Sequence, residues 1–203
     1  MDAAKIRLSP LEMQVVNNTE WILTKNGIMQ KAKCLMEFLQ NDIQNYVNIH
    51  PSSLPADVLK FAPKISKGEN YKGLPYLVLD YPRCFQKNNV YAIRCMFWWG
   101  NFFSTTLHLS GQYKQQFSDK LVRAYHIFFE KEFFLCNGED EWEHHFENTN
   151  YTPLSEMMQD EFKNKIASLS FIKIAKQFPL SAWNNIQNEL LENFKLLLKL
   201  CKT

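Results

Sequence analysis

The sequence has no long apolar run, no C-x-x-C pair and almost no net charge. No stretch approaches the roughly 20 apolar residues that a membrane-spanning helix needs, and no secretory signal is legible at the start of the chain. The five cysteines are odd in number and widely spaced, which argues against zinc ribbons and dithiol redox sites. We therefore expect a cytoplasmic protein with reduced thiols, without a metal and without a cofactor.

The balance of charges argues against large anionic partners. The formal net charge is +2, and the 23 Lys and Arg residues are scattered among 21 Asp and Glu residues. A nucleic-acid-binding protein usually concentrates its basic residues on one face. We therefore expect neither a nucleic acid nor a membrane as a partner, and the oligomeric state is left open.

The standard catalytic and phosphate-binding motifs are also missing. The chain contains no G-x-S-x-G elbow and no H-E-x-x-H pair. The run Lys64–Gly73 has the lysines and glycines of an anion-binding loop, but it matches neither standard glycine-rich pattern. No familiar enzyme class is indicated.

What the sequence does contain is a globular composition rich in aromatic residues. Of its 203 residues, 46% are hydrophobic and 14% aromatic, with 16 Phe. A chain of this length buries roughly 70% of the surface that its unfolded form exposes. We expect a single α+β domain over residues 1–203, with an antiparallel sheet whose central strands form an aromatic hairpin. Helices are expected to be segregated at the N-terminus, in the middle and at the C-terminus.

Residues 1–50 predict a helical N-terminal layer. The run Ser9–Glu12, SPLE, has the form of a capping box with proline at the first helical position. Gly27 is a natural helix stop, and a second helix is expected to follow it and to end before Pro51. The two helices would form a hairpin. The Pro- and Gly-rich stretch after residue 50 predicts a loop with only short structure.

Residues 75–147 predict most of the sheet, with one inserted helix, and residues 152–203 predict a helix, a strand and a helix. Within the first region we expect a strand that stops at Pro82, then two strands around Gly100-Asn101. A helix is expected after Gly111, and a second hairpin around Asn137-Gly138. In the last region the predicted elements are a helix from Thr152, a strand over 170–178 and a closing helix over 180–201.

The hairpin around Gly100-Asn101 is predicted to have two different faces. A two-residue turn would place Cys95 opposite Thr106 and Arg94 opposite Leu107. In this register Cys95, Ser104, Thr106 and His108 share one face, and Arg94 lies on the other. The polar side chains are then either core groups with satisfied hydrogen bonds or the lining of a pocket.

Arg94, Cys95, Ser104, Thr106 and His108 are the candidate ligand-binding residues. A guanidinium keeps its proton, so burial of Arg94 requires a partner. That partner is either a carboxylate, with Asp80 the nearest candidate, or a small anionic ligand. Cys95 and His108 are the nearest approach to a nucleophile with its base.

The acidic run Glu139–Glu147 is a candidate metal-binding segment. Read as a strand, it places Glu143, His145 and Glu147 on one face. Such a face could bind a metal if it were concave. A solvated acidic face is the interpretation that we favour, and we expect no metal there.

One segment carries a family resemblance. Tyr71, Lys72, Leu74 and Pro75 lead into the aromatic strands, which resembles the YktB-like family of bacterial proteins of unknown function. The resemblance implies a bacterial cytoplasmic α+β domain and supplies no catalytic residues.

These observations favour a small-molecule-binding or accessory protein whose ligand is a small anion. The alternative is a small transferase or hydrolase with a non-standard active site on the hairpin face. That enzyme would use Cys95, His108 or Arg94.

Overall fold

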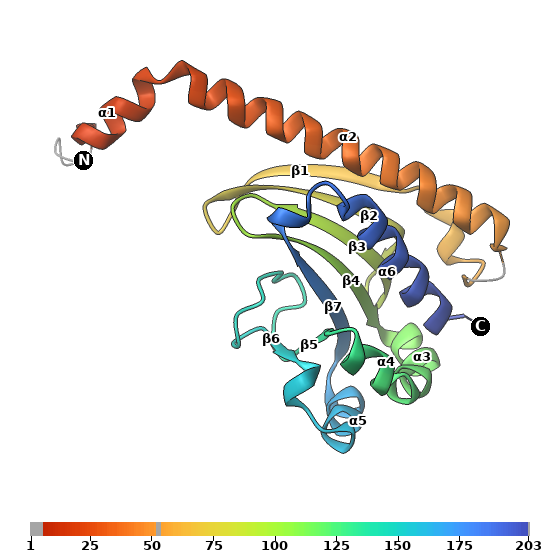
Figure 1. Ribbon diagram of the computed structural model, residues 1–203. Coiled ribbons are helices and arrows are strands. Elements are labelled where there is room, and N and C mark those ends of the chain that lie inside the picture. Colours follow the sequence, from red (N-terminus) through yellow and green to blue (C-terminus); the bar gives the residue numbers. More distant parts are fainter. Residues whose placement is uncertain (1–5, 52–53, 203) are drawn as a thin grey trace. The chain divides into compact units, whose positions relative to one another are not determined.

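The computed structural model describes residues 6–51 and 54–202, which form two compact units (Figure 1). The first unit, Met1–Leu35, contains helix α1 (Pro10–Asn17) and the beginning of helix α2 (Thr19–Ile49). The second unit, Met36–Thr203, contains the remainder of α2 and the whole sheet. The predicted helical N-terminal layer is thus divided between the two units.

Helix α1 begins at the predicted capping box. The Ser9 hydroxyl accepts a hydrogen bond from the Glu12 N–H, and the Glu12 carboxylate accepts one from the Ser9 N–H, at 3.3 and 2.6 Å. A new cap follows at Asn18, whose side chain accepts the Trp21 N–H at 3.1 Å and starts α2. The expected hairpin at Gly27 is wrong, because α2 continues through this residue. One interior glycine costs a helix only about 1 kcal/mol.

The second unit is built on a seven-stranded antiparallel sheet, which confirms the α+β class. The strand order is β1-β2-β3-β4-β7-β5-β6, so that the aromatic β3–β4 hairpin lies at the centre. The strands are β1 (Lys64–Tyr71), β2 (Leu74–Gln86), β3 (Asn89–Trp98), β4 (Phe102–Ser110), β5 (Phe134–Cys136), β6 (Tyr151–Pro153) and β7 (Phe171–Pro179).

Helices cover one face of this sheet, which we call the helix face. Helices α3 and α6 both pack on β3 and β4, and Figure 1 shows α6 lying along the sheet. Trp183 contacts Phe97 and Phe103, with ring centroids 5.7 and 5.4 Å apart. The helices of this unit after α2 are η3 (Val58–Lys60), α3 (Gly111–Arg123), α4 (Tyr125–Glu130), η4 (Leu154–Glu156), α5 (Gln159–Ser168), η5 (Leu180–Ala182) and α6 (Ile186–Leu200).

Several predicted elements take a different form. The stretch expected to be a loop contains β1, and β2 passes Pro82 because its pairing with β3 shifts register there. No hairpin forms at Asn137-Gly138. Instead β5 pairs with β6 across the loop 137–150. The helix expected at Thr152 is replaced by β6 and η4, and α5 begins later.

The central hairpin turns through three residues rather than two. Trp98 pairs with Phe102, the Asn101 N–H donates to the Trp98 carbonyl at 3.1 Å, and Gly100 has a φ of 72°. One additional turn residue moves every side chain of the partner strand to the other face. The predicted register is therefore wrong by one residue, and Arg94 lies opposite Thr106.

The loop 137–150, which we call the cover loop, lies over the second face of the sheet. We call this second face the loop face. Phe146 of the cover loop packs against Phe102, Phe134 and Tyr151, with ring centroids 5.0, 5.0 and 4.7 Å away. The prediction that both faces of the hairpin are covered is confirmed.

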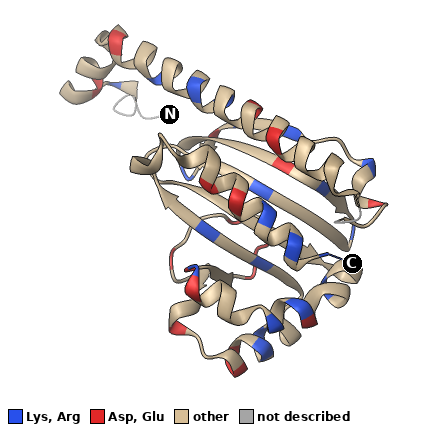
Figure 2. Ribbon diagram, turned by 45° about the vertical axis from the view of Figure 1, so that its right-hand side comes forward, with Lys and Arg blue, Asp and Glu red and all other residues tan. Residues whose placement is uncertain are grey.

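Charged residues of both signs occur along the helices (Figure 2). Within the described part of the chain, no helix is long and apolar enough to cross a membrane.

The turn conformation leads to a first prediction. Gly100→Val should lower the free energy of unfolding by more than about 1 kcal/mol, because a β-branched residue is strained at positive φ. Gly100→Asn should cost clearly less, since asparagine tolerates this region. Urea unfolding of the three proteins measures the order. If the valine variant is as stable as the parent, the turn does not require this backbone conformation.

Candidate functional site

A buried ion pair lies at the centre of the loop face. Arg94 and Asp80 are cross-strand partners on β3 and β2. The guanidinium donates from Nε to Oδ1 at 2.7 Å and from Nη2 to Oδ2 at 2.9 Å, a bidentate geometry. The two side chains are only 18% and 8% exposed. Of the two partners considered for Arg94, the structure shows the carboxylate of Asp80, which occupies both of these guanidinium nitrogens.

The third nitrogen of the guanidinium holds the cover loop. Arg94 Nη1 lies 2.8 Å from His144 Nε2. Burial, together with the charge of Arg94, holds the pKa of His144 well below its usual range. The imidazole is therefore neutral at pH 7. Because the guanidinium can only donate, His144 Nε2 accepts this hydrogen bond.

A second buried cation, Lys173, lies on β7 opposite His108. Its ammonium donates to the Glu143 carbonyl of the cover loop and lies 5.5 Å from the centre of the Tyr151 ring. Burial lowers the pKa of Lys173 to about 8. Two cations thus lie under one loop, and both contact it.

His108 extends the hydrogen-bonded groups of the loop face to Glu141 of the cover loop. Its Nε2 lies 2.9 Å from Oε2 of Glu141. Burial, aided by the charges of Lys173 and Arg94, lowers the pKa of His108 to about 3. The contact is therefore a hydrogen bond donated by a neutral imidazole rather than an ion pair. Burial also raises the pKa of Glu141 above its ordinary value.

The acidic run forms this cover loop and no strand, so its expected strand face is wrong. Tyr71 Oη donates to the Glu143 carboxylate at 2.7 Å and accepts the N–H groups of His144 and His145 at 2.7 and 3.1 Å. Glu143 and Glu147 lie 3.3 and 3.6 Å from the two nitrogens of the His145 ring. In the residues that the structure describes, no His, Cys, Asp and Glu side chains are grouped to hold a metal.

The one-residue change of register sorts the predicted ligand residues differently. Arg94 joins Ser104, Thr106 and His108 on the loop face, whereas Cys95 points to the helix face beside Thr105. The expected sharing of a face by Cys95 and His108 is wrong. Burial raises the pKa of the Cys95 thiol to about 12, which makes it a poor nucleophile.

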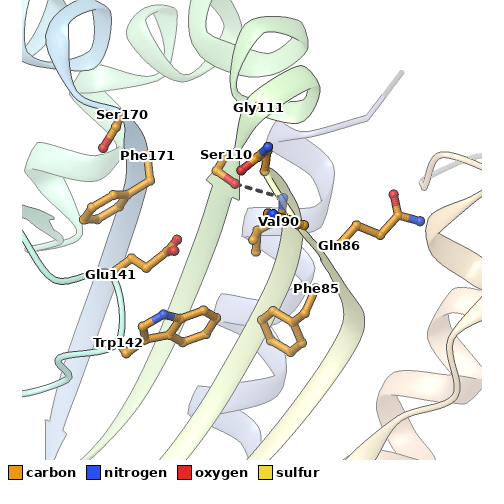
Figure 3. A pocket seen from close by; sticks show the side chains of 11 residues that line it. Phe85, Gln86, Val90, Ser110, Gly111, Glu141, Trp142, Ser170 and Phe171 are labelled. Carbon is orange, nitrogen blue, oxygen red and sulfur yellow. Dashed lines mark hydrogen bonds between the residues drawn. The ribbon is translucent and has the colours of Figure 1, made fainter.

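A pocket of about 530 Å³ opens beside His108, and we call it the end pocket (Figure 3). Figure 3 shows Glu141 and Trp142 next to each other, with Phe85 and Phe171 on either side. The rings of Trp142 and Phe171 lie 5.6 and 5.8 Å from His108, which is behind the wall of the pocket. The aromatic, apolar and charged side chains that line this pocket are Phe85, Lys87, Val90, Glu141, Trp142 and Phe171.

Sequence reasoning missed Glu141, Trp142 and Lys173. Two of them belong to the run EDEWEHHFE, in which attention went to the histidines and not to the lone tryptophan. Lys173 lies between Ile172 and Ile174 in the buried first half of β7, and a charged residue in such a position signals a specific partner.

Comparisons with protein-family models, with curated proteins and with solved structures find no match. The resemblance to the YktB-like family stays a prediction.

Removal of Arg94 should be strongly destabilising. Arg94→Met should lower the free energy of unfolding by about 3–5 kcal/mol, because Asp80 is left buried without its partner. Arg94→Met combined with Asp80→Asn should recover much of this loss. Urea unfolding of both single variants and the double variant measures the coupling. A loss below about 1 kcal/mol in the single variant would mean that water replaces the guanidinium.

The depressed pKa of His108 implies loss of stability in acid. In the unfolded chain His108 becomes protonated below a pKa of about 6.5. In the folded chain it becomes protonated only below a pKa of about 3. Stability should therefore fall as pH decreases from 6.5. His108→Gln should make this fall shallower, by up to about 1.4 kcal/mol per pH unit.

Urea unfolding from pH 7.5 to 4.5 tests this dependence. The matched control is His126→Gln, which removes an exposed histidine outside the network and should retain the parental slope. Equal slopes for the parent and His108→Gln would show that His108 is protonated in the folded state as readily as in the unfolded one.

Proposed function

We propose that the protein binds a small molecule and that the end pocket is its site. The observation that carries this proposal is Trp142, which is 48% exposed on an anchored loop at a cavity with two further rings. The volume lies within the roughly 300–1,000 Å³ of ordinary ligand pockets. A ligand with a flat or apolar body would cover these rings and remove their surface from water.

The anchoring of the cover loop supports a preformed site. Glu141 is held by His108, and the next residues of the loop are held by Tyr71, Arg94 and Lys173. A loop that is already ordered loses little conformational entropy when a ligand binds. Asn150 closes the far end by donating to the His145 carbonyl at 2.6 Å.

The charges of the pocket favour a cationic group on the ligand. The anionic ligand predicted from the sequence depended on Arg94, whose charge is matched by Asp80. In the end pocket, Glu141 presents a carboxylate that is 32% exposed and oriented by His108, beside aromatic rings that attract cations. Lys87 is exposed on the β2–β3 turn. An anion bound through Lys87 is the alternative.

Paired probes test the proposal. Tryptamine and benzylamine should bind more tightly than indole-3-acetate and benzoate, as measured by calorimetry and by the melting temperature. Trp142→Ala should weaken binding of the amines about tenfold or more, and Glu141→Gln should abolish the preference for amine over acid. The control Phe38→Ala removes a ring that is 61% exposed outside the pocket and should change nothing.

Two results would contradict the proposal. Binding that is indifferent to Trp142→Ala would place the site elsewhere. Tighter binding of the acids, lost on Lys87→Gln, would establish an anion site.

One observation favours an enzyme as the second candidate. Glu141 combines a raised pKa with a position inside a cavity, as a proton-transferring group requires. Recovery of the bound compound unchanged, as judged by mass spectrometry, supports a binding protein. Conversion that is lost in Glu141→Gln while binding persists supports catalysis.

We also propose a reducing compartment such as the cytoplasm of a bacterium. All five cysteines are free, which supports this assignment because free thiols persist where glutathione and thioredoxin act. The bacterial origin is an implication of the YktB-like resemblance alone.

A further inference from the structure

The end pocket contains two opposite charges that are not paired with each other. The carboxylate of Glu141 lines the pocket and is bound by His108, whose imidazole is neutral. Lys87 lines the same pocket. In the part of the chain that the structure describes, its ammonium forms no ion pair, either with Glu141 or with another carboxylate. A ligand that matches both charges must therefore carry a positive and a negative group.

Lys87 belongs to a two-residue turn that is fixed against the start of α3. The second turn residue, Asn88, has a φ of 69°. The side chain of Asn89 accepts the Gln112 N–H at 2.9 Å. A side chain at Gly111 would collide with the Asn88 carbonyl, because the turn and the helix approach each other closely at this point. The backbone of Lys87 is thus held at the rim of the pocket, while its long side chain can adapt to a ligand.

A hydroxyl group adds a donor beside this turn. Ser110 lines the pocket, and its Oγ accepts the Val90 N–H at 2.9 Å (Figure 3). A hydroxyl that accepts one hydrogen bond keeps its own hydrogen for donation. Figure 3 shows Gln86, the chain neighbour of Lys87, and Glu141 on opposite sides of Ser110. The donors and the carboxylate therefore lie on different sides of the pocket.

Aromatic rings add an apolar requirement. Phe85 and Trp142 pack together with ring centroids 5.8 Å apart, and Phe171 lines the same pocket. A flat ring covers such a surface and removes it from water. An amine without an acidic group would bring a second positive charge into the pocket of Lys87, where like charges repel. A carboxylate on the same ligand removes this repulsion.

We infer that the ligand of the end pocket is a small aromatic zwitterion. Glu141 binds its ammonium group, and Lys87 binds its carboxylate with the Ser110 hydroxyl as a further donor. Hydrogen bonds to charged groups are stronger than those between neutral ones, so each end of the ligand adds to its affinity. This inference rests on the proposed function of the end pocket and names the chemical class of its ligand.

Zwitterions compared with amines of the same skeleton isolate the contribution of the carboxylate. Tryptophan carries a carboxylate next to the amine of tryptamine, and para-aminomethylbenzoate carries one across the ring from the amine of benzylamine. At least one of the two zwitterions should bind about fivefold more tightly than its amine, as measured by calorimetry. The two compounds differ in the separation of their charges, so the better one reports the spacing of the two charged sites.

A single lysine variant tests the assignment. Lys87→Gln should remove the gain, so that zwitterion and amine bind alike, while the affinity for the amine stays the same or rises. Raising the salt concentration should also reduce the gain in the parent, because exposed charges are screened. The matched control Lys199→Gln removes an exposed lysine of α6 that lies outside the end pocket and should retain the gain.

The outcomes separate this inference from the proposed function. Amines that bind at the end pocket while both zwitterions bind no more tightly would overturn the inference and leave the binding site in place. A gain that survives Lys87→Gln would also overturn it, because the carboxylate would then be bound elsewhere. Absence of binding by amines and zwitterions alike would contradict the proposed function, and the inference with it.

Discussion

The loop face depends on one constraint, which is that a guanidinium in the middle of a covered sheet keeps its charge. Arg94 needs a carboxylate, and Asp80 supplies it from the neighbouring strand at 2.7 and 2.9 Å. The remaining donor of Arg94 fixes His144. Burial lowers the pKa of His108 and of His144, and the nearby charges of Arg94 and Lys173 lower both further, so that both imidazoles stay neutral. A neutral His108 can orient Glu141 by a single hydrogen bond.

The same network explains how an irregular segment covers a sheet. The cover loop has no strand or helix of its own, and its backbone is tied down by side chains of the sheet and of its neighbours. Tyr71 and Lys173 bind its N–H and carbonyl groups directly. Phe146 provides the apolar part of the contact. The polar contacts set the position of the loop, and this position brings Trp142 to the end pocket.

Local pattern was sufficient where the relevant contact is local. The capping box at Ser9, the strand predicted over 170–178 and the closing amphipathic helix follow from neighbouring residues. All three form, although α6 begins at Ile186 rather than at residue 180. The pairing of Arg94 with Asp80 was also accessible, because a buried arginine requires a carboxylate. The register of the central hairpin was not. The sequence around Gly100-Asn101 is compatible with a turn of two residues and with a turn of three. The length of the turn decides which face of the sheet Cys95 and Arg94 occupy.

The sequence by itself determined the class of fold, the central hairpin and the need of Arg94 for a partner, because periodicity, turn residues and burial of charge act over short distances. Only the tertiary structure decided which residues form a site. Glu141 and Trp142 reach the end pocket through contacts with His108 and Phe85, each far away in the chain. Lys173 meets Glu143 in the same way. Such contacts depend on how the cover loop packs against the sheet, which is decided by residues far apart in the chain.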